Sequence, residues 1–555
     1  MYLCVSTAST IQAAEPDTNN DTYDDTNFDI YIPLCGEGVK LALNDAEIGT
    51  HARIGNITFR IGDVFNLDIA EENRFVYRLA NKLHNRTKKH VIKQQLLFQT
   101  GDPFSIRLLE ESERILRNNK FIADAQIVPY QCKNNVIDID VITRDSWSLT
   151  GGVHFSRSGG ANKLSFEIDE NNFIGLGKQL KLLRKLDIDR NESLISYTDN
   201  NVIGSRNKMS LMFSDKTDGV TSSITLDRPF YKLDSKWTAG FTYSLDDRTD
   251  PIYRFGEVVN EYQHKNEFLE IRGGLSDGYF KKVIYRWNFG FTKETDNYST
   301  LPDTTNINDI PKDQDFRYPW ASLKFIHDQY IKKTRISQLH RVEDVNLGNE
   351  LDIKVGWSDK HVGALDEGLI YEATLNTAFA LNNDQLILIK PYLDGRYIAN
   401  KATNTVIGFD YKHYFPNFEK QVFYLSFNAE HSYNLDSNAQ LSLGGDTGLR
   451  GYPLRFQQGE RRLLLTLEQR LYTDWHWFQL LRVGGVAFFD VGRAWSSDTQ
   501  KNDNTGILKD VGLGLRMSSS RTSSGVIVRF DLAFPLDGDS SIDNMQFLVT
   551  SSNTF

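Results

Sequence analysis

Residues 444–453 read Gly444-Gly445-Asp446-Thr447-Gly448-Leu449-Arg450-Gly451-Tyr452-Pro453 and interrupt a long region of alternating apolar and polar residues. Glycine and proline at this density disfavour a regular helix or strand, so we expect a compact loop with several residues at positive φ. We call this stretch the LRGY loop, after Leu449-Arg450-Gly451-Tyr452 at its centre. One arginine inside such a loop suggests an ion pair that holds the loop against a wall; the alternative is an ordinary solvated hairpin loop.

Alternation extends on both sides of the LRGY loop, from Trp147 to the last residue. Segments of about ten residues with one apolar and one polar parity are typical of an outer-membrane β-barrel, apolar towards lipid and polar towards the lumen. A soluble β-sandwich or propeller would also alternate. We count about 20 candidate strands over 147–555, roughly 15 before the LRGY loop and five after it. Residues 294–317, rich in Asp, Asn and Thr, would form an extracellular loop.

Composition excludes several classes of protein. The chain has 555 residues and a formal net charge of −10, which argues against a general nucleic-acid binder. No stretch approaches the roughly 18 consecutive apolar residues that a membrane helix needs. The aromatic content of 12% fits a barrel, whose average hydropathy stays low because its strands alternate.

Charges after the LRGY loop share the polar parity of four successive strands. They are Glu468 and Arg470, Asp490 beside Gly492, Arg516, and Arg529 with Asp531. A charge facing lipid at mid-bilayer costs about 2–4 kcal/mol, so we expect all of them in the lumen. Arg450 could then pair with Asp490 or Glu468, and a bidentate pair would hold the loop in place. Simple charge balance in the lumen is the alternative.

Four motifs and the last residue, taken in order, resemble the BamA/TamA superfamily, also called the bacterial surface antigen family. They are Leu449-Arg450-Gly451-Tyr452, Phe488-Phe489-Asp490-Val491-Gly492, Gly512-Leu513-Gly514-Leu515-Arg516, Asp531-Leu532-Ala533-Phe534-Pro535-Leu536 and a terminal Phe555, the expected C-terminal signal. The resemblance implies a barrel of about 16 strands in which the loop arginine meets the strand aspartate. Those roles pass to Arg450 and Asp490, with Gly451, Tyr452 and Gly492 as motif partners. Hairpins near 264–293 and 368–398 would be additions or miscounts.

Residues 53–145 have the pattern of a small α/β domain. A strand near Ile57–Ile61 is followed by apolar residues at helical spacing, a break at Gly101-Asp102-Pro103, a helix from Ser105 and two further strands. This β-α-α-β-β order resembles a polypeptide-transport-associated (POTRA) domain, although 63–86 is a longer insertion than that layout has. We expect a periplasmic POTRA-like domain here.

The N-terminal segment is apolar and then acidic. Residues 1–14 read as a partial signal peptide without its basic start, and 15–52 as an acidic leader and linker. Cys35 and Cys132 would form a disulfide in an oxidising compartment; two unpaired thiols are the equal alternative.

The resemblance implies assembly, insertion or translocation of a client polypeptide, or of a lipid, at the outer membrane of a Gram-negative bacterium. The partners would be the client, outer-membrane lipids and periplasmic proteins at the POTRA-like domain. The seam between first and last strands, near 147–156 and 545–555, would template a client strand by β-augmentation.

Other functions remain open at this point. A passive channel or receptor needs neither the domain nor the loop pair, whereas a dedicated polypeptide secretion pore cannot be told from an insertase by residues alone. We expect no enzyme, cofactor or metal site: no Gly-x-Ser-x-Gly occurs, and His476 beside Trp475 and Trp477 reads as part of an aromatic belt.

Overall fold

The computed structural model describes residues 52–552 apart from short segments. The described ranges are 52–133, 135–158, 161–187, 190–254, 257–302, 306–307, 310–381, 385–436, 439–496, 506–522, 525–537 and 542–552. The expectations for the signal peptide at 1–14, for the leader up to residue 51, for a Cys35–Cys132 disulfide and for Phe555 lie outside the described residues.

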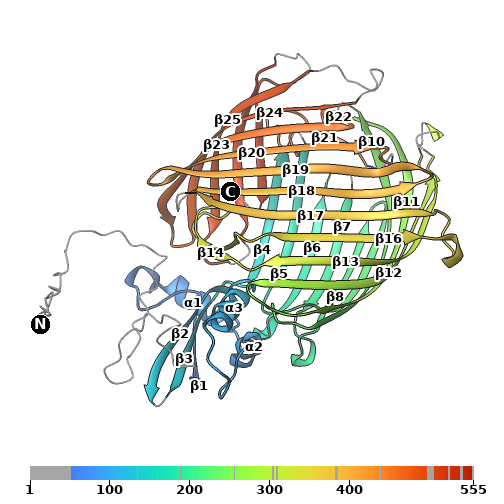
Figure 1. Ribbon diagram of the computed structural model, residues 1–555. Helices are drawn as coiled ribbons and strands as arrows, with labels where there is room; N and C mark the ends of the chain where they lie inside the picture. The colour runs from blue at the N-terminus through green and yellow to red at the C-terminus, as the bar shows by residue number, and fades with distance from the viewer. Residues whose placement is uncertain are drawn as a thin grey trace, which may run out of the picture. The chain divides into compact units, whose positions relative to one another are not determined.

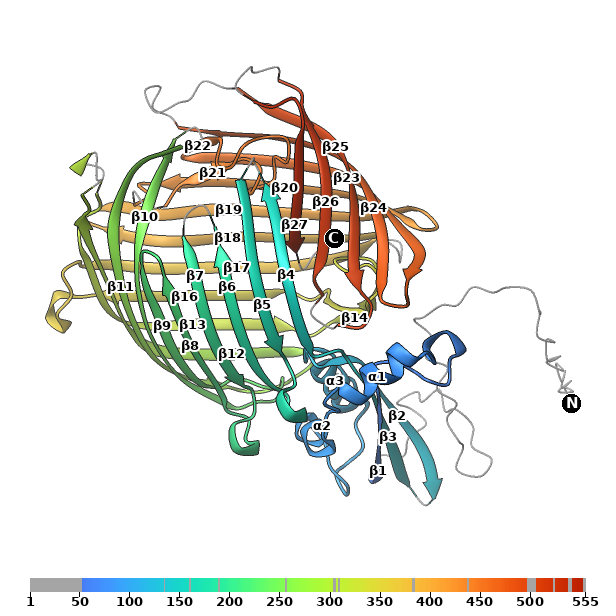
Figure 2. The ribbon, with the colours of Figure 1, turned by 180° about the vertical axis from the view of Figure 1, so that it is seen from behind.

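Residues from Leu149 to Ser552 form a closed antiparallel β-barrel, seen from opposite sides in Figures 1 and 2. Each wall strand pairs with the next along the chain, and the last pairs with the first. The wall strands are β4 (Leu149–Ser158), β5 (Ala161–Glu170), β6 (Lys178–Leu186), β7 (Asn191–Asp199), β8 (Lys208–Lys216), β9 (Gly219–Arg228), β10 (Trp237–Arg254), β11 (Glu257–Ser276), β12 (Val283–Thr300), β13 (Gln314–His327), β16 (Glu350–Ser358), β17 (Gly368–Leu381), β18 (Gln385–Ile398), β19 (Lys401–Phe418), β20 (Gln421–Tyr433), β23 (Arg461–Trp477), β24 (Leu481–Trp495), β25 (Leu508–Ser519), β26 (Ile527–Pro535) and β27 (Gln546–Ser552).

The expected barrel is confirmed, and its number of strands agrees with the count from the alternating pattern. Over the described residues the wall has 20 strands, 15 before the LRGY loop and five after it. The expectation of about 16 strands is wrong, because the hairpins near 264–293 and 368–398 are wall strands β11–β12 and β17–β18. The expected extracellular loop at 294–317 is also too long, since β12 runs to Thr300 and β13 starts at Gln314.

The outer face of the wall is apolar and the inner face carries charges, as the alternation along the strands predicted. Outward-facing Trp287, Leu513 and Phe534 are exposed, whereas inward-facing Asp490 and Arg516 have no accessible surface. An apolar outer face around the barrel and charges inside it are the arrangement of a barrel that spans a membrane.

The first and last wall strands, β4 and β27, meet at the seam of the barrel and share few backbone pairs among the described residues. Among the described residues, β27 and β4 share a single register pair, Val549 with Arg157. The neighbouring strand pairs β26–β27 and β4–β5 are registered along seven and ten residue pairs. In the described part of the chain, the seam is therefore the place in the wall with the fewest backbone pairings.

Residues 53–145, the N-domain, form a three-stranded sheet with helices. The order is β1 (Arg53–Gly62), α1 (Phe75–Leu83), α2 (Lys89–Gln95), α3 (Ile106–Arg117), β2 (Ile122–Lys133) and β3 (Val136–Asp145), and the sheet order is β1-β3-β2. The apolar spacing that predicted one helix before Gly101 belongs to two. Helix α2 packs on the sheet through Val91 and Ile92, whereas α1 does not join that core.

Turns from around one end of the barrel hold the N-domain, and we call this the N-domain end. On one side of the seam, Asn172 Nδ2 donates to Thr87 Oγ1 at 2.9 Å and the Lys88 amide to the Gly175 carbonyl at 3.0 Å. On the other side, Arg521 pairs with Glu72. Figure 2 shows this end of the barrel with α1 beneath it.

Candidate functional site: a loop and a hairpin inside the barrel

The LRGY loop folds into the lumen from the far end of the barrel. It connects β20 to β23, and its base is a hairpin of β21 (Leu441–Leu443) and β22 (Gln457–Gly459). The Leu449 amide donates to the Gly444 carbonyl at 3.0 Å, and the Gly445 amide to the Pro453 carbonyl at 3.0 Å. Of the loop's ten residues, all described, only Gly448 has a positive φ, +114°, so the expectation of several is wrong.

Arg450 contacts two wall carboxylates from this loop. Its Nε donates to Asp490 Oδ2 at 2.7 Å and its Nη2 to Asp490 Oδ1 at 2.9 Å, while Nη1 donates to Glu468 Oε1 at 2.9 Å. The guanidinium also lies over the Phe488 ring, 3.5 Å from its centroid. The structure therefore brings together all three charges that the sequence singled out, with the fork geometry that suits a carboxylate.

The motif glycine and tyrosine make their own contacts beside Arg450. The Gly451 amide donates to Asp510 Oδ2 at 3.0 Å, and a Cβ at Gly451 would lie 2.7 Å from the Asp510 Cβ. Tyr452 is fully buried, and its hydroxyl donates to the Lys509 carbonyl at 2.8 Å and contacts Asp537. Only glycine fits at position 451 without displacing the wall.

Asp490 and Asp510 are directly opposite each other in the β24–β25 ladder, and both are fully buried. Two adjacent carboxylates repel each other unless positive charge and N–H donors compensate. The LRGY loop supplies both, because Arg450 binds one aspartate and the Gly451 amide the other. The loop is thus held by the electrostatics of the wall as well as by packing.

The remaining predicted lumen residues lie around this centre. Arg470 donates through Nε to Glu468 Oε2 at 2.9 Å, and Arg516 Nη1 donates to Asp531 Oδ1 at 2.6 Å. Arg529 is half-buried on the same face of β26. A Cβ at Gly492 would lie 2.7 Å from Leu443 Cδ2, so this glycine leaves room for the base of the loop.

A second segment enters the lumen from the N-domain end. Residues 328–349 connect β13 to β16 and include the hairpin β14 (Tyr330–Lys333) and β15 (Glu343–Asn346). We call this segment the plug. Its Ile336 and Leu339 pack in the main lumen cluster with Tyr414, Tyr472 and Phe488. Glu343 accepts the amides of Ile336 at 3.1 Å and Ser337 at 3.0 Å, which closes the tip of the plug.

The plug connects the N-domain to the LRGY loop. Arg117 on α3 donates to Asp344 Oδ1 at 2.8 Å, and Arg470 Nη1 donates to the Ile336 carbonyl at 3.2 Å. Arg470 also binds Glu468, which accepts from Arg450. The plug therefore links the two parts, with polar contacts to the N-domain at one end and, through Arg470 and Glu468, to the LRGY loop at the other.

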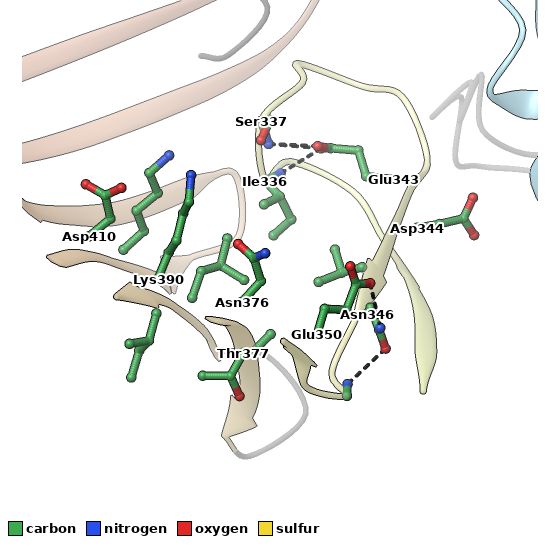
Figure 3. A pocket seen from close by; sticks show the side chains of 16 residues that line it. Ile336, Ser337, Glu343, Asp344, Asn346, Glu350, Asn376, Thr377, Lys390 and Asp410 are labelled. Atoms are coloured by element: carbon green, nitrogen blue, oxygen red, sulfur yellow. Dashed lines mark hydrogen bonds between the residues drawn. The ribbon is translucent and has the colours of Figure 1, made fainter. Parts of the chain in front are cut away.

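A cavity of about 500 Å³ lies between the plug and the wall. Figure 3 shows Glu343, Glu350 and Asn346 on one side of it and Lys390 with Asp410 on the other. Its lining mixes charged residues such as Lys390 and Asp410 with apolar ones such as Ala378 and Leu388, so the plug packs on β17–β19 only in part and leaves a polar space beside that contact.

Where the plug meets the N-domain, Glu113 contacts both Arg117 and Lys332. Burial opposes ionisation of Glu113, but the hydrogen bond and charge of Lys332 and the charge of Arg117 outweigh it and lower the pKa of Glu113 below 4.5. The Glu113–Lys332 part of the contact between the N-domain and the plug therefore depends on an ionised Glu113.

We expect this contact to weaken in acid. Because the pKa of Glu113 is lower in the folded state, its stabilising contribution is complete above pH 4.5 and is lost as pH falls through the folded value. The measurement is the thermal unfolding temperature against pH for the wild type and Glu113→Gln. The variant should unfold earlier at neutral pH and lose part of the acid dependence; parallel curves would contradict the assignment.

Sequence reasoning missed Asp510, Asp537 and the whole plug. The sequence did contain a sign of Asp510, because it lies two residues before Gly512 and so belongs to the same inward-facing set as Gly512, Gly514 and Arg516. Trp475 and Trp477, on either side of His476, are exposed and stacked, and the His476 ring contacts Ser520 Oγ at 2.8 Å.

Among the described residues, no helix is long and apolar enough to cross a membrane, and no cluster of His, Cys, Asp and Glu could hold a metal ion. No protein-family model matches the sequence, and no curated protein matches it.

Solved structures do match. CdiB from Acinetobacter baumannii is 12% identical with a TM-score of 0.46, over 91% of this chain and 74% of that chain. CdiB from Escherichia coli is 13% identical with a TM-score of 0.45, over 91% and 77%. BamA from Haemophilus ducreyi lacking POTRA domains 1–3 is 13% identical with a TM-score of 0.39, over 90% and 84%. The chain is thus similar to CdiB and BamA structures along nine-tenths of its length, at identities that assign no role to any residue.

Proposed function

We propose that this chain is an outer-membrane barrel of the BamA/TamA superfamily that inserts or translocates a client polypeptide. The N-domain would be a periplasmic POTRA-like domain, so the N-domain end of the barrel faces the periplasm and the LRGY loop enters from outside. Client handling would take place at the seam of β4 and β27, without a catalytic step or a cofactor.

The observation that carries the proposal is the bidentate contact of Arg450 with Asp490, supported by Glu468. It joins two residues 40 positions apart at the motif positions on which the resemblance to the superfamily rests. The closure through one register pair supports the site of action, because an edge freed there offers unpaired N–H and C=O groups to an incoming strand.

A disulfide across the seam tests this proposal. Directly opposite residues of an antiparallel pair have Cα atoms about 4.5–5.5 Å apart, within the range that a disulfide spans. We expect oxidised Val549→Cys/Arg157→Cys to fold as a barrel but to lose insertion of a test barrel into liposomes, and reduction to restore it. Cys4, Cys35 and Cys132 are replaced by serine in all variants.

The matched control is Met517→Cys/Val528→Cys, a register pair of β25 and β26 away from the seam. This disulfide should leave insertion unchanged whether oxidised or reduced. Insertion that survives oxidation of the seam pair would remove the seam from the mechanism.

Dedicated secretion through the lumen is the second candidate. The observation that favours it is the plug, a separate segment that fills part of a wide lumen. In the same experiment, a seam cross-link that blocks insertion but not passage of a secreted polypeptide would indicate that route. A permanently open channel is disfavoured by the plug and the LRGY loop, which occupy the lumen together.

A further inference from the structure

Helix α1 presents an apolar face that no part of the described chain covers. Phe75 is 70% exposed, Val76 66% and Leu83 68%, and Leu79 lies between them on the same face. The spacing of Phe75, Leu79 and Leu83 predicted a helix, yet the face they share does not join the core of the N-domain. Four large apolar side chains on a nine-residue helix are more than scattered surface hydrophobics.

The opposite face of α1 fixes the helix to the barrel. Tyr77 is buried, stacks on Phe65 with ring centroids 4.7 Å apart and donates from its hydroxyl to the Phe478 carbonyl at 2.6 Å. Asn81 Nδ2 donates to the Phe65 carbonyl at 2.8 Å. Packing of Tyr77 and Ala80 beside Trp147 and Leu480 completes this contact. Helix α1 is therefore held at a definite place on the rim.

That place adjoins the lipid-facing surface of the barrel. Phe478, whose carbonyl binds Tyr77, is 77% exposed at the turn between β23 and β24. Trp475 and Trp477 just before it are exposed and stacked, with ring centroids 6.4 Å apart. Exposed tryptophans at a strand end mark the level of the membrane–water interface in barrels. Figure 2 shows α1 at this end, lying crosswise to the strands.

The third face of α1 is basic. Arg74, Arg78 and Lys82 recur every four residues, directly beside the apolar face, and all three are exposed. A helix with an apolar face flanked by cations is the type that lies in the plane of a membrane interface and binds anionic headgroups. The face with Tyr77 binds the barrel, and the described part of the chain leaves the apolar and the basic face open to lipid.

We propose that α1 docks on the phospholipid leaflet that surrounds the N-domain end of the barrel, with its apolar face in the headgroup–acyl boundary and its basic face on anionic headgroups. The site extends the lipid-facing belt of β23 and β24 beyond the wall. It fixes the N-domain against the membrane as well as against the barrel, and it does not depend on the client or on the seam.

The test uses single cysteines in the full chain, with the three native cysteines replaced by serine, each labelled with an environment-sensitive fluorophore. Leu83→Cys reports α1, and Val136→Cys, exposed where the N-domain hairpin β2–β3 points away from the barrel, is the control. Barrels are reconstituted at one per vesicle in phosphatidylcholine with phosphatidylglycerol. We expect the Leu83 label to shift to the blue, to lose quenching by aqueous iodide and to gain quenching by spin-labelled lipid, while the Val136 label shows none of these three changes.

Two further comparisons, one of charge and one of the number of barrels per vesicle, distinguish the possible outcomes. Arg74→Ser, Arg78→Ser and Lys82→Ser together should reduce lipid quenching of the Leu83 label, and omission of phosphatidylglycerol should reduce it in the protein that keeps all three basic residues. Equal iodide quenching at Leu83 and Val136 would overturn the proposal. So would protection that appears only with several barrels per vesicle, which would indicate a second copy on this face, or protection without lipid quenching, which would indicate another part of the chain. Heat-modifiable migration confirms folding of each variant.

Discussion

Arg450→Ala is expected to destabilise the folded barrel by about 3–5 kcal/mol, because it leaves buried carboxylates without their cation. Asp490 has no accessible surface and Glu468 is nearly as buried, so water cannot replace the guanidinium without opening the wall. The measurement is the urea midpoint of the heat-modifiable, compact form in detergent. Arg450→Lys keeps the positive charge but loses the planar guanidinium that binds Asp490 through two N–H groups. Its midpoint should therefore lie between those of wild type and Arg450→Ala.

The control for this prediction is Arg455→Ala. Arg455 lies just beyond the same loop, 3.8 Å from Asp446, and both side chains are about a quarter exposed, so water can solvate Asp446 when the guanidinium is removed. Its midpoint should match the wild type. An Arg450→Ala midpoint equal to that of Arg455→Ala would show that the loop contact contributes no stability. Unchanged stability with lost insertion would instead assign Arg450 a role in function alone.

Removal of the plug is expected to convert the barrel into an open channel. A barrel of about 16–18 strands already leaves an aqueous pore, and this wall has more. The Leu347 amide donates to the Gln329 carbonyl at 2.9 Å, so an Asn-Gly turn can replace residues 330–346 and join the two ends as a hairpin. Single-channel conductance in planar bilayers should rise from brief, infrequent events to a long-lived open state.

Two further variants accompany the plug deletion, one with an intermediate expected effect and one as a control. Ile336→Ala with Leu339→Ala weakens packing against Tyr472 and Phe488 and should give intermittent opening. Leu513→Ala removes an exposed side chain from the outer wall and should leave conductance as in the wild type. Conductance that does not change on deletion would mean that the LRGY loop alone seals the lumen.

The sequence was sufficient for the wall because a strand in lipid has only one admissible parity. A charge on the outer face is costly, so Glu468, Asp490 and Arg516 could be placed in the lumen without coordinates. Arg450 then had few partners within reach, and its contact with Asp490 and Glu468 followed. The strand number came from the same alternation, whereas the expectation of about 16 came from resemblance and does not hold for this chain.

The sequence was insufficient where the same pattern has two physical outcomes. Apolar residues at helical spacing in α1 predict a helix, but not whether the face they share meets a protein core or lipid. Residues 328–349 contain two four-residue strands that resemble a continuation of the wall, and only their packing on Tyr472 shows that they enter the lumen. Asp510 needed the register of β24 with β25 before its closeness to Asp490 became visible.

Residues 72–88 contact the barrel on both sides of the weakly closed seam. Glu72 and Tyr77 hold the turns that follow β25 and β23, while Thr87 and Lys88 hold the turn that follows β5. In the opening proposed for the seam, this segment bridges the two edges, so parting β27 from β4 strains its contacts. The contacts of this short stretch of the N-domain therefore add to the register pair between the edge strands in resisting the proposed opening.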